Sequence, residues 1–184
     1  MNIIVKPHNS DLCYCRPDTT WEKESRDLYI PEGVDKVLWA PVVFAKVSKA
    51  GKCVSPKFVT RYYDAVGFGA LTYCDEENIA FSSCMDHSSL MPMPSLSPSV
   101  LESGEGTVVI SAGAEKVSIN ANKSMQAALE EAICKSSKRV SLRIGDVVAV
   151  ELTELKVLAQ RSEGDITFKA EYNESGLFDL KVIF

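Results

Sequence analysis

The composition of this chain fits one compact domain and excludes several classes of protein. The chain has 184 residues, 46% of them hydrophobic, and a chain of that length buries roughly two thirds of the surface that it exposes when unfolded. Neither a metal nor a disulfide is needed to hold such a fold together. The net charge is −5, with Lys and Arg scattered among acidic residues along the sequence, so we expect no nucleic-acid partner.

The sequence shows no targeting or membrane segment. The apolar run near the amino terminus ends at Lys6-Pro7 and is too short for a signal peptide, and no stretch approaches the roughly 20 apolar residues that cross a bilayer. We therefore expect a cytoplasmic protein without membrane contact, in which the six cysteines are reduced. Cys13 and Cys15 form the only close pair, which is too little for a zinc site.

The first half of the chain reads as strands around one helix. The predicted strands are residues 3 to 5, 28 to 30, 37 to 45 and 68 to 74. Residues 8 to 27 are polar and predict a loop, and Pro41 predicts an edge or a bulge in the third strand. Ser55 and Pro56 form a helix start, and apolar residues at i, i+4 and i+7 extend the predicted helix to Val66.

The second half predicts more strands and a longer helix. Residues 88 to 103 are rich in Ser, Pro and Met and predict a connection without regular structure. The elements expected after it are a hairpin of residues 107 to 111 and 117 to 119, a helix over 125 to 137, and strands over 147 to 152, 166 to 172 and 177 to 184. About nine strands and two substantial helices indicate a mainly antiparallel α+β domain.

Several short motifs occur in an order that resembles the fumarylacetoacetate hydrolase family. They are Lys6-Pro7, Ile30-Pro31, Val43 to Lys46, Gly67-Phe68, Asn120 to Met125 and the strand around Gly145-Asp146. The resemblance is to the catalytic, C-terminal domain of that family and covers nearly the whole chain. It implies a single domain over residues 1 to 184 with a mixed β-roll and two main helices. The connection at 88 to 103 would then divide two halves of one domain.

The resemblance also implies a divalent-metal site whose ligands this sequence lacks. Members of the family perform enol–keto chemistry on 2,4-dioxo acids and related compounds, with Mg²⁺ or a similar cation held by a Glu-x-Glu and an Asp. Here the Glu-x-Glu falls on Val37-Leu38-Trp39 or on Leu38-Trp39-Ala40, and the Asp falls on Tyr73. Hard cations require oxygen ligands, so we expect no metal cofactor unless Asp75 and Asp86 build a new Mg²⁺ site.

Two further positions point the same way. The lysine found in many members falls near Ser83, and the Gly-Thr-Pro that contacts the substrate carboxylate becomes Glu151-Leu152-Thr153, which would repel an acid. We expect a protein that has lost the family's chemistry and now binds a small molecule or a protein. The alternative is a divergent hydrolase, isomerase or decarboxylase acting on a small oxo acid. Because family members commonly form dimers, we expect a homodimer.

Six residues are candidates for the lining of the pocket. They are Lys6, His8, Trp39, Tyr73, Asp86 and Glu151. His8 is either a general base in the old cleft or a loop histidine, and Trp39 either packs in the core or fills the vacated metal pocket. Asp86, His87 and Ser88 are neighbours on one stretch of chain, which does not supply the geometry of a catalytic triad.

Overall fold

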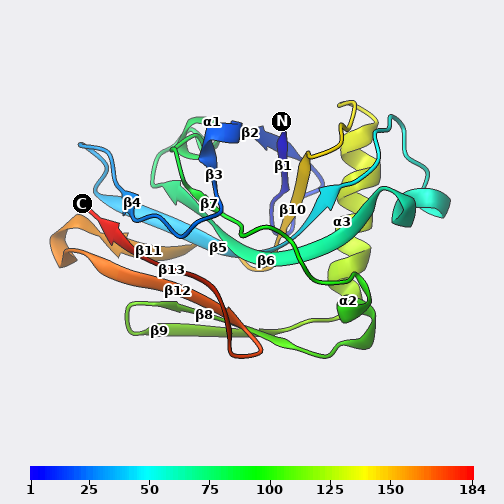
Figure 1. Ribbon diagram of the computed structural model, residues 1–184. Helices are drawn as coiled ribbons and strands as arrows, with labels where there is room; N and C mark the ends of the chain where they lie inside the picture. Colours follow the sequence, from blue (N-terminus) through cyan, green and yellow to red (C-terminus); the bar gives the residue numbers. More distant parts are fainter.

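The computed structural model consists of two β-sheets that pack face to face, with one long helix at their side (Figure 1). It describes residues 1 to 184 apart from the side chain of Ile79. The larger sheet has the strand order β2-β1-β10-β5-β6-β7-β3, with β11 also paired to β5. The smaller sheet has the order β4-β13-β12-β8-β9.

The strands of the larger sheet are β1 (Ile3–Lys6), β2 (Tyr14–Arg16), β3 (Trp21–Glu22), β5 (Lys36–Val47), β6 (Tyr63–Cys74), β7 (Ser89–Leu90), β10 (Val147–Glu151) and β11 (Lys156–Gln160). Those of the smaller sheet are β4 (Leu28–Tyr29), β8 (Thr107–Ala112), β9 (Glu115–Asn120), β12 (Ile166–Tyr172) and β13 (Ser175–Ile183). The helices are α1 (Ile79–Ser82), α2 (Ser99–Ser103) and α3 (Lys123–Ser137), with 3-10 helices η1 (Asp18–Thr20), η2 (Pro56–Arg61) and η3 (Arg161–Glu163).

The expected fold class is confirmed, because the structure is a mixed α+β arrangement in which antiparallel pairing predominates. Only β1 with β10, β3 with β7, and β4 with β13 pair in parallel among the described strands. The smaller sheet forms one wall, and the ends of the larger sheet curl over the opposite face of β5 and β6 (Figure 1). The curled part encloses a second hydrophobic cluster, so both faces of β5 and β6 are buried.

The long antiparallel ribbon of β5 and β6 separates the two apolar clusters. Since successive side chains of a strand point to opposite faces, Trp39 and Val43 face the smaller sheet, while Val42 and Phe44 face the interior of the roll. The ring of Trp39 meets that of Phe168 on β12 edge to face, with centroids 5.2 Å apart. This contact joins the two sheets.

Pro41 lies in the middle of β5 rather than at an edge or a bulge, and the gap between β10 and β11 explains how the sheet accommodates it. The pairing of β10 with β5 ends at Val42, and that of β11 begins at Trp39. The carbonyl of Pro41 accepts a hydrogen bond from Leu152, so the side of Pro41 that lacks an N–H faces this gap.

The helix predicted from Ser55 to Val66 is wrong beyond its first turns. It is the 3-10 helix η2, which ends at Arg61, and Tyr63 to Val66 belong to β6. The spacing of apolar residues misled the prediction because β6 is buried on both faces, and such a strand carries apolar residues at any spacing. As a consequence, α3 is the one substantial helix in the described part of the chain.

Short elements inside the expected loops were also missed. Residues 8 to 27 contain β2, η1 and β3, and residues 88 to 103 contain β7 and α2. Strands of two or three residues are too short to show a period. The predicted hairpin is confirmed as β8 and β9, and the predicted second helix as α3, whose cap Asn122 accepts hydrogen bonds from the N–H groups of Ser124 and Met125.

None of the helices in the described part of the chain has the length and apolar character that crossing a bilayer requires.

Candidate functional site

A chain of hydrogen bonds crosses the interior of the roll and ends at a carboxylate on its wall. The hydroxyl of Tyr73 on β6 donates to Glu151 Oε1 at the end of β10. Tyr14 on β2 shares a hydrogen bond of 2.6 Å with the same Tyr73 hydroxyl. The other oxygen of Glu151 accepts from the backbone N–H of His8 at 3.1 Å. Glu151 is therefore held through both of its oxygens, by Tyr73 of β6 and by the backbone of His8 in the loop after β1.

Burial controls the proton affinity of this chain. Glu151 is only 6% exposed, and burial raises its pKa, against the opposing effects of the hydrogen bonds from Tyr73 and His8. Burial likewise raises the pKa of Tyr14 to about 12 and that of Tyr73 well above its ordinary value. Both phenols hence keep their protons at neutral pH, and each is able to donate a hydrogen bond along the chain.

Outside the roll, Glu151 borders a cavity of about 470 Å³ between the ends of β1 and β10 and the start of α3. Its wall includes Lys6 and His8 as well as Glu151, and Met125 and Ala128 of α3 lie across from them. The ammonium of Lys6 is held by Glu131 at 3.2 Å. This hollow has the size of a small-molecule site and combines apolar surface with a few polar groups.

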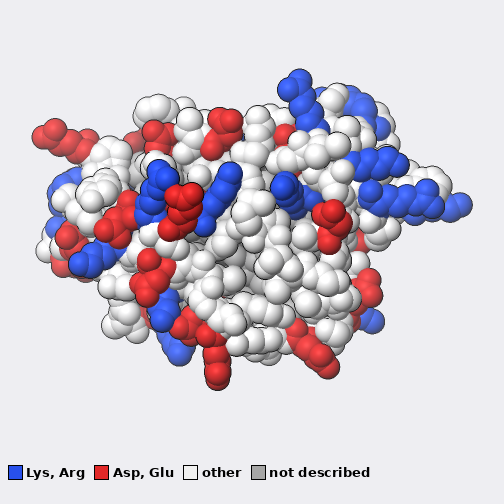
Figure 2. Space-filling model, viewed as in Figure 1, with Lys and Arg blue, Asp and Glu red and all other residues white. Residues whose placement is uncertain are grey.

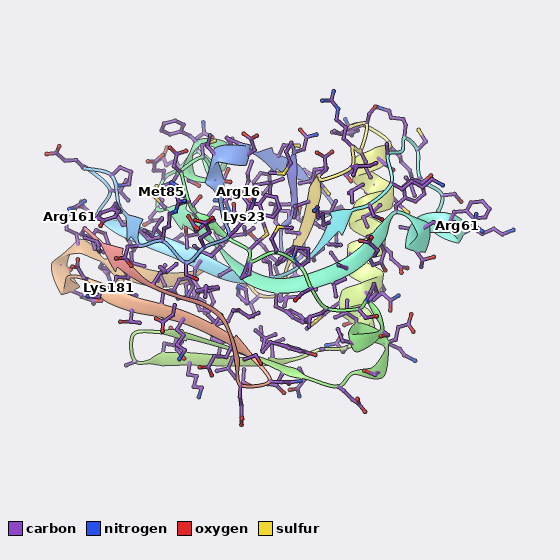
Figure 3. All side chains as sticks on the ribbon, in the orientation of Figure 1. Arg16, Lys23, Arg61, Met85, Arg161 and Lys181 are labelled. Carbon is purple, nitrogen blue, oxygen red and sulfur yellow. The ribbon has the colours of Figure 1, made fainter. Side chains whose placement is uncertain are left out.

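Arg16, labelled in Figure 3, is almost completely buried. Its Nε donates to the carbonyl of Ser83, and its Nη2 donates to the carbonyl of Thr72 and to Ser88 Oγ, at 2.7 to 2.8 Å. The guanidinium carbon lies 4.8 Å from the centre of the Tyr73 ring. Nη1 has no hydrogen-bond partner among the described residues. A cation thus lies within the roll without a carboxylate bound directly to it.

The pairing of β5 with β6 decides which of the two possible registers of the Glu-x-Glu shares a face with Tyr73. Tyr73 lies directly opposite Leu38, and residues opposite each other in an antiparallel pair point to the same face. Leu38 and Ala40 therefore face the interior of the roll together with Tyr73. Val37 and Trp39 face the other way, into the core between the sheets.

The residues on this face do not fit the three-carboxylate site implied by the resemblance. Leu38 and Ala40 offer no ligand atom, and Tyr73 is a protonated phenol bound to Glu151. Glu151 is a single carboxylate whose two oxygens already accept hydrogen bonds. The described part of the chain contains no group of three His, Cys, Asp or Glu residues close enough to hold a metal. A hard cation needs several oxygen ligands together.

The structure brings four of the six candidate residues together. Lys6, His8 and Glu151 line the cavity, and Tyr73 contacts Glu151 from inside the roll. Trp39 is fully buried between the sheets, which answers the question left open for it in favour of core packing. Asp86 is exposed on the segment after α1, away from the cavity.

The other groups that the sequence singled out are occupied elsewhere. Asp75 is paired with Lys36 at 2.5 Å, and Asp86 does not join it in a metal-binding group of the described residues. His87 Nδ1 lies 2.8 Å from Glu22, while Ser88 is hydrogen-bonded to Arg16. Asp86, His87 and Ser88 hence do not act on one another.

Tyr14 and Arg16 are the site residues that the sequence did not reveal. Both lie on β2, a strand of three residues within a polar segment, and Tyr14 stood out only as the residue between two cysteines. Their partners Tyr73, Thr72 and Ser83 come from β6 and the segment after α1. No spacing within the sequence indicates such contacts.

Comparison with known proteins supports the fold but gives no match by sequence. No protein-family model and no curated protein matches the chain. A solved structure described as a fumarylacetoacetate hydrolase family protein from Yersinia pestis CO92 superimposes with a TM-score of 0.81, at 14% identity over 99% of this chain and 92% of that one. This chain has the fold of the fumarylacetoacetate hydrolase family.

Two further structures with the fumarylacetoacetate hydrolase fold show how far the sequences have diverged. Maleylpyruvate hydrolase from Sphingobium sp. SYK-6, in complex with manganese(II) and pyruvate, has a TM-score of 0.80 at 11% identity over 99% of this chain and 70% of that one. The 2-hydroxyhepta-2,4-diene-1,7-dioate isomerase from Mycobacterium marinum has a TM-score of 0.79 at 9% identity, with coverage of 99% and 74%. Identities this low leave the chemistry of this chain to be argued from its own residues.

Proposed function

We propose that this chain is a fumarylacetoacetate hydrolase-fold protein that binds a small molecule in the cavity beside Glu151, independently of a three-carboxylate metal site. One observation carries the proposal. Tyr73, at the position of the expected metal-binding Asp, is hydrogen-bonded to Glu151, at the position of the expected substrate-carboxylate contact. The two positions that should hold a metal and an acid bind each other instead.

The polar groups of the cavity suggest the kind of ligand. Glu151 presents carboxyl oxygens whose remaining lone pairs accept hydrogen bonds, and Asp11 lines the same hollow. Lys6 is already paired with Glu131. A ligand that donates hydrogen bonds, such as an amine or a polyol, therefore suits the Glu151 side of the cavity better than a free carboxylate does.

Calorimetric titration with Mg²⁺, Mn²⁺ and Ca²⁺ tests the metal-independent part of the proposal. We expect no stoichiometric binding below millimolar concentration, the weak end of oxygen-ligand affinities. Tight stoichiometric binding by the wild-type protein would contradict the proposal, since it would require a carboxylate site that the described residues do not form.

A matched pair of variants tests the assignment of faces. The first variant carries Leu38→Glu, Ala40→Glu and Tyr73→Asp, which places three carboxylates on the face toward the interior of the roll. We expect added Mn²⁺ to raise the melting temperature of this variant, because a cation that binds only the folded state stabilises it. Val37→Glu with Trp39→Glu and Tyr73→Asp places two of them between the sheets. Mn²⁺ should not stabilise that variant, and an equal response of both would refute the assignment.

A thermal-shift screen with amines, polyols and oxo acids tests the binding site. Ala128 lines the cavity, and its neighbour Ala127 lines other hollows on α3. Ala128→Trp should abolish the stabilisation by any ligand found, whereas Ala127→Trp should preserve it. A panel without a single stabilising compound, or a ligand unaffected by Ala128→Trp, would count against this cavity.

A second candidate function is a metal-independent reaction on a small oxo acid. The observation that favours it is the Tyr14–Tyr73–Glu151 chain, which holds a carboxyl of raised pKa at the wall of the cavity, an arrangement suited to proton transfer. If the protein only binds a ligand, as first proposed, acylpyruvates, oxaloacetate and maleylpyruvate should not be turned over, with or without Mg²⁺. Turnover that is lost in both Glu151→Gln and Tyr73→Phe would establish this function in place of the first.

A further inference from the structure

One end of the molecule is basic although the chain as a whole is acidic. The sequence contains no Asp or Glu between Lys36 and Asp64, and none between Glu131 and Asp146. Residues 46 to 61 and 132 to 145 hold nine of the 20 basic residues. The remainder of the chain therefore has 11 basic and 25 acidic residues, a net charge of −14. Nine of the basic residues that look scattered along the sequence thus belong to two segments without acidic residues.

The fold places these two segments side by side. Gly51 and Leu142 exchange both of their backbone hydrogen bonds, and the N–H of Cys53 donates to the carbonyl of Ser137 at 2.9 Å. The ammonium of Lys52 donates to the carbonyl of Arg139 at 2.8 Å. Figure 2 shows the result as blue side chains gathered at the upper right, where η2 and the loop after α3 lie in Figure 1.

The cations of this end are exposed and lack acidic partners. Seven of them have exposed side chains, namely Lys49, Lys52, Lys57, Arg61, Lys138, Arg139 and Arg143. None of these seven makes an ion pair among the described residues, whereas Lys6, Lys36, Lys156 and Lys169 elsewhere on the molecule all do. We call these seven residues the basic surface. Asp11, Glu130 and Glu131 line the hollows that Lys138 borders, but among the described residues none of them forms an ion pair with a cation of the basic surface.

A cavity of about 590 Å³ opens at one side of the basic surface, between β2 and the end of α3. Lys138 and Arg139 lie on its rim, and its walls include Ile4, Leu12 and Val140. Lys138 also borders a smaller hollow lined by Pro56 and Val59 of η2. The surface thus runs from the cavity to the tip of η2, where Figure 3 labels Arg61.

We propose that the basic surface binds an acidic segment of a partner protein, which inserts one apolar side chain into the cavity between β2 and α3. The spread of seven cations exceeds the size of a small anion, and it calls for a chain with several negative charges. The cavity adds an apolar pocket next to the charges, as in interfaces where the side chain of one anchor residue fills a pocket of the partner. An acidic peptide with one apolar side chain uses both the charges and the cavity, which a phosphate backbone by itself does not.

Fluorescence anisotropy with a labelled peptide rich in Asp and Glu and carrying one Phe tests this proposal. We expect binding that weakens as salt is raised to about 0.15 M, because exposed charges are screened. Replacing the Phe of the peptide by Ala should weaken binding further. A peptide that binds equally well without its Phe would refute the role of the cavity.

Charge reversal locates the surface. Lys138→Glu with Arg139→Glu, and separately Lys57→Glu with Arg61→Glu, should each lower the affinity about tenfold or more, since like charges then face the peptide. The matched control is Lys116→Glu with Lys181→Glu, two exposed cations of the smaller sheet, which should leave the affinity nearly unchanged. Circular dichroism checks that each variant is folded.

The same variants separate the proposed partner from other polyanions. Phosphatidylserine vesicles and a single-stranded oligonucleotide are tested beside the peptide at equal salt. Tighter binding of either one than of the peptide, or an equal loss in the Lys116→Glu, Lys181→Glu control, would overturn the proposal. The peptide should also slow the alkylation of Cys15, which is exposed at the cavity, without slowing that of Cys84, which does not line it.

Discussion

Glu151 links the site to the stability of the fold through pH. Burial raises its pKa above the ordinary value of 4.5, so the folded protein holds this proton more tightly than the unfolded chain does. The stabilisation that follows is complete below about pH 4.5 and is lost as the pH rises through the folded pKa. The buried carboxyl of Glu151 therefore destabilises the folded state least when it is protonated.

We expect the substitution Glu151→Gln to reveal this dependence. We compare the free energy of unfolding of the wild type with that of the variant. The difference, wild type minus variant, should decrease when the pH is raised from about 4 to about 8, because glutamine does not titrate. Urea unfolding at both values measures it. Glu171→Gln is the control, because Lys169 lowers the pKa of Glu171 and the same difference in free energy should change with pH in the opposite direction. A parallel change in the two variants would contradict the argument.

Arg16 holds three parts of the roll through one planar group. A lysine at this position has a single nitrogen and cannot reach both Ser83 and Thr72 in the directions that the guanidinium does. We expect Arg16→Lys to lower the free energy of unfolding by about 1.5–3 kcal/mol, the range for hydrogen bonds to charged groups. Arg26→Lys, on an exposed pair with Glu24, should change it by less than about 0.5 kcal/mol. Equal effects would show that the buried contacts of Arg16 are not important.

At the level of single residues, the sequence predicted Glu151, Tyr73, Lys6 and His8 as neighbours of the cavity, because they occupy ordered motifs. It could not decide whether Val37 and Trp39 or Leu38 and Ala40 share a face with Tyr73. A shift of one residue reverses the face of every side chain. The strand β5 is buried on both faces and so gives no alternation from which to read the register.

Among the elements, β7 lies against β6 at a glycine that leaves no room for a side chain. A Cβ on Gly69 would lie 2.2 Å from the carbonyl oxygen of Leu90. We expect Gly69→Ala to push β7 away and to lower the free energy of unfolding by about 1–3 kcal/mol, as overpacking does. Gly176→Ala is the matched control, since nothing lies within 4 Å of the corresponding position. Chemical denaturation of both variants measures the difference, and a stable Gly69→Ala protein would refute the contact.

The predictability of an element followed its length and its exposure. The alternation of β12 and the apolar periodicity of α3 lie within consecutive residues, and both elements were predicted nearly to their ends. The strands β2, β3 and β7 exist because distant strands offer them hydrogen-bonding edges. Their own residues show no hydrophobic periodicity from which these strands could have been predicted.

For the whole molecule, the contact between the two sheets should be the main source of cooperative stability. Phe168 packs between Trp39 and Phe178, with ring centroids 5.2 Å from each. Phe168→Ala should lower the free energy of unfolding by about 3–5 kcal/mol through the cavity that it creates. The fluorescence of Trp39 in a Trp21→Phe background reports on this core, and Val157→Ala at an exposed position is the control. A loss no larger than that of the control would show that the sheets are only loosely joined.

Two of the parallel pairs, β1 with β10 and β4 with β13, join segments that are far apart in the sequence. Ile3 on β1 pairs with Val147, and Leu28 on β4 pairs with Val182, so the segments synthesised first find their partners among those synthesised last. Until these partners are made, the ribbon of β5 and β6 lacks part of the cover on each of its apolar faces. Chains dominated by such distant contacts fold slowly, and a newly made chain with this ribbon exposed is open to aggregation. We therefore expect a newly made chain to be most prone to aggregation until residues 175 to 183 are available to pair.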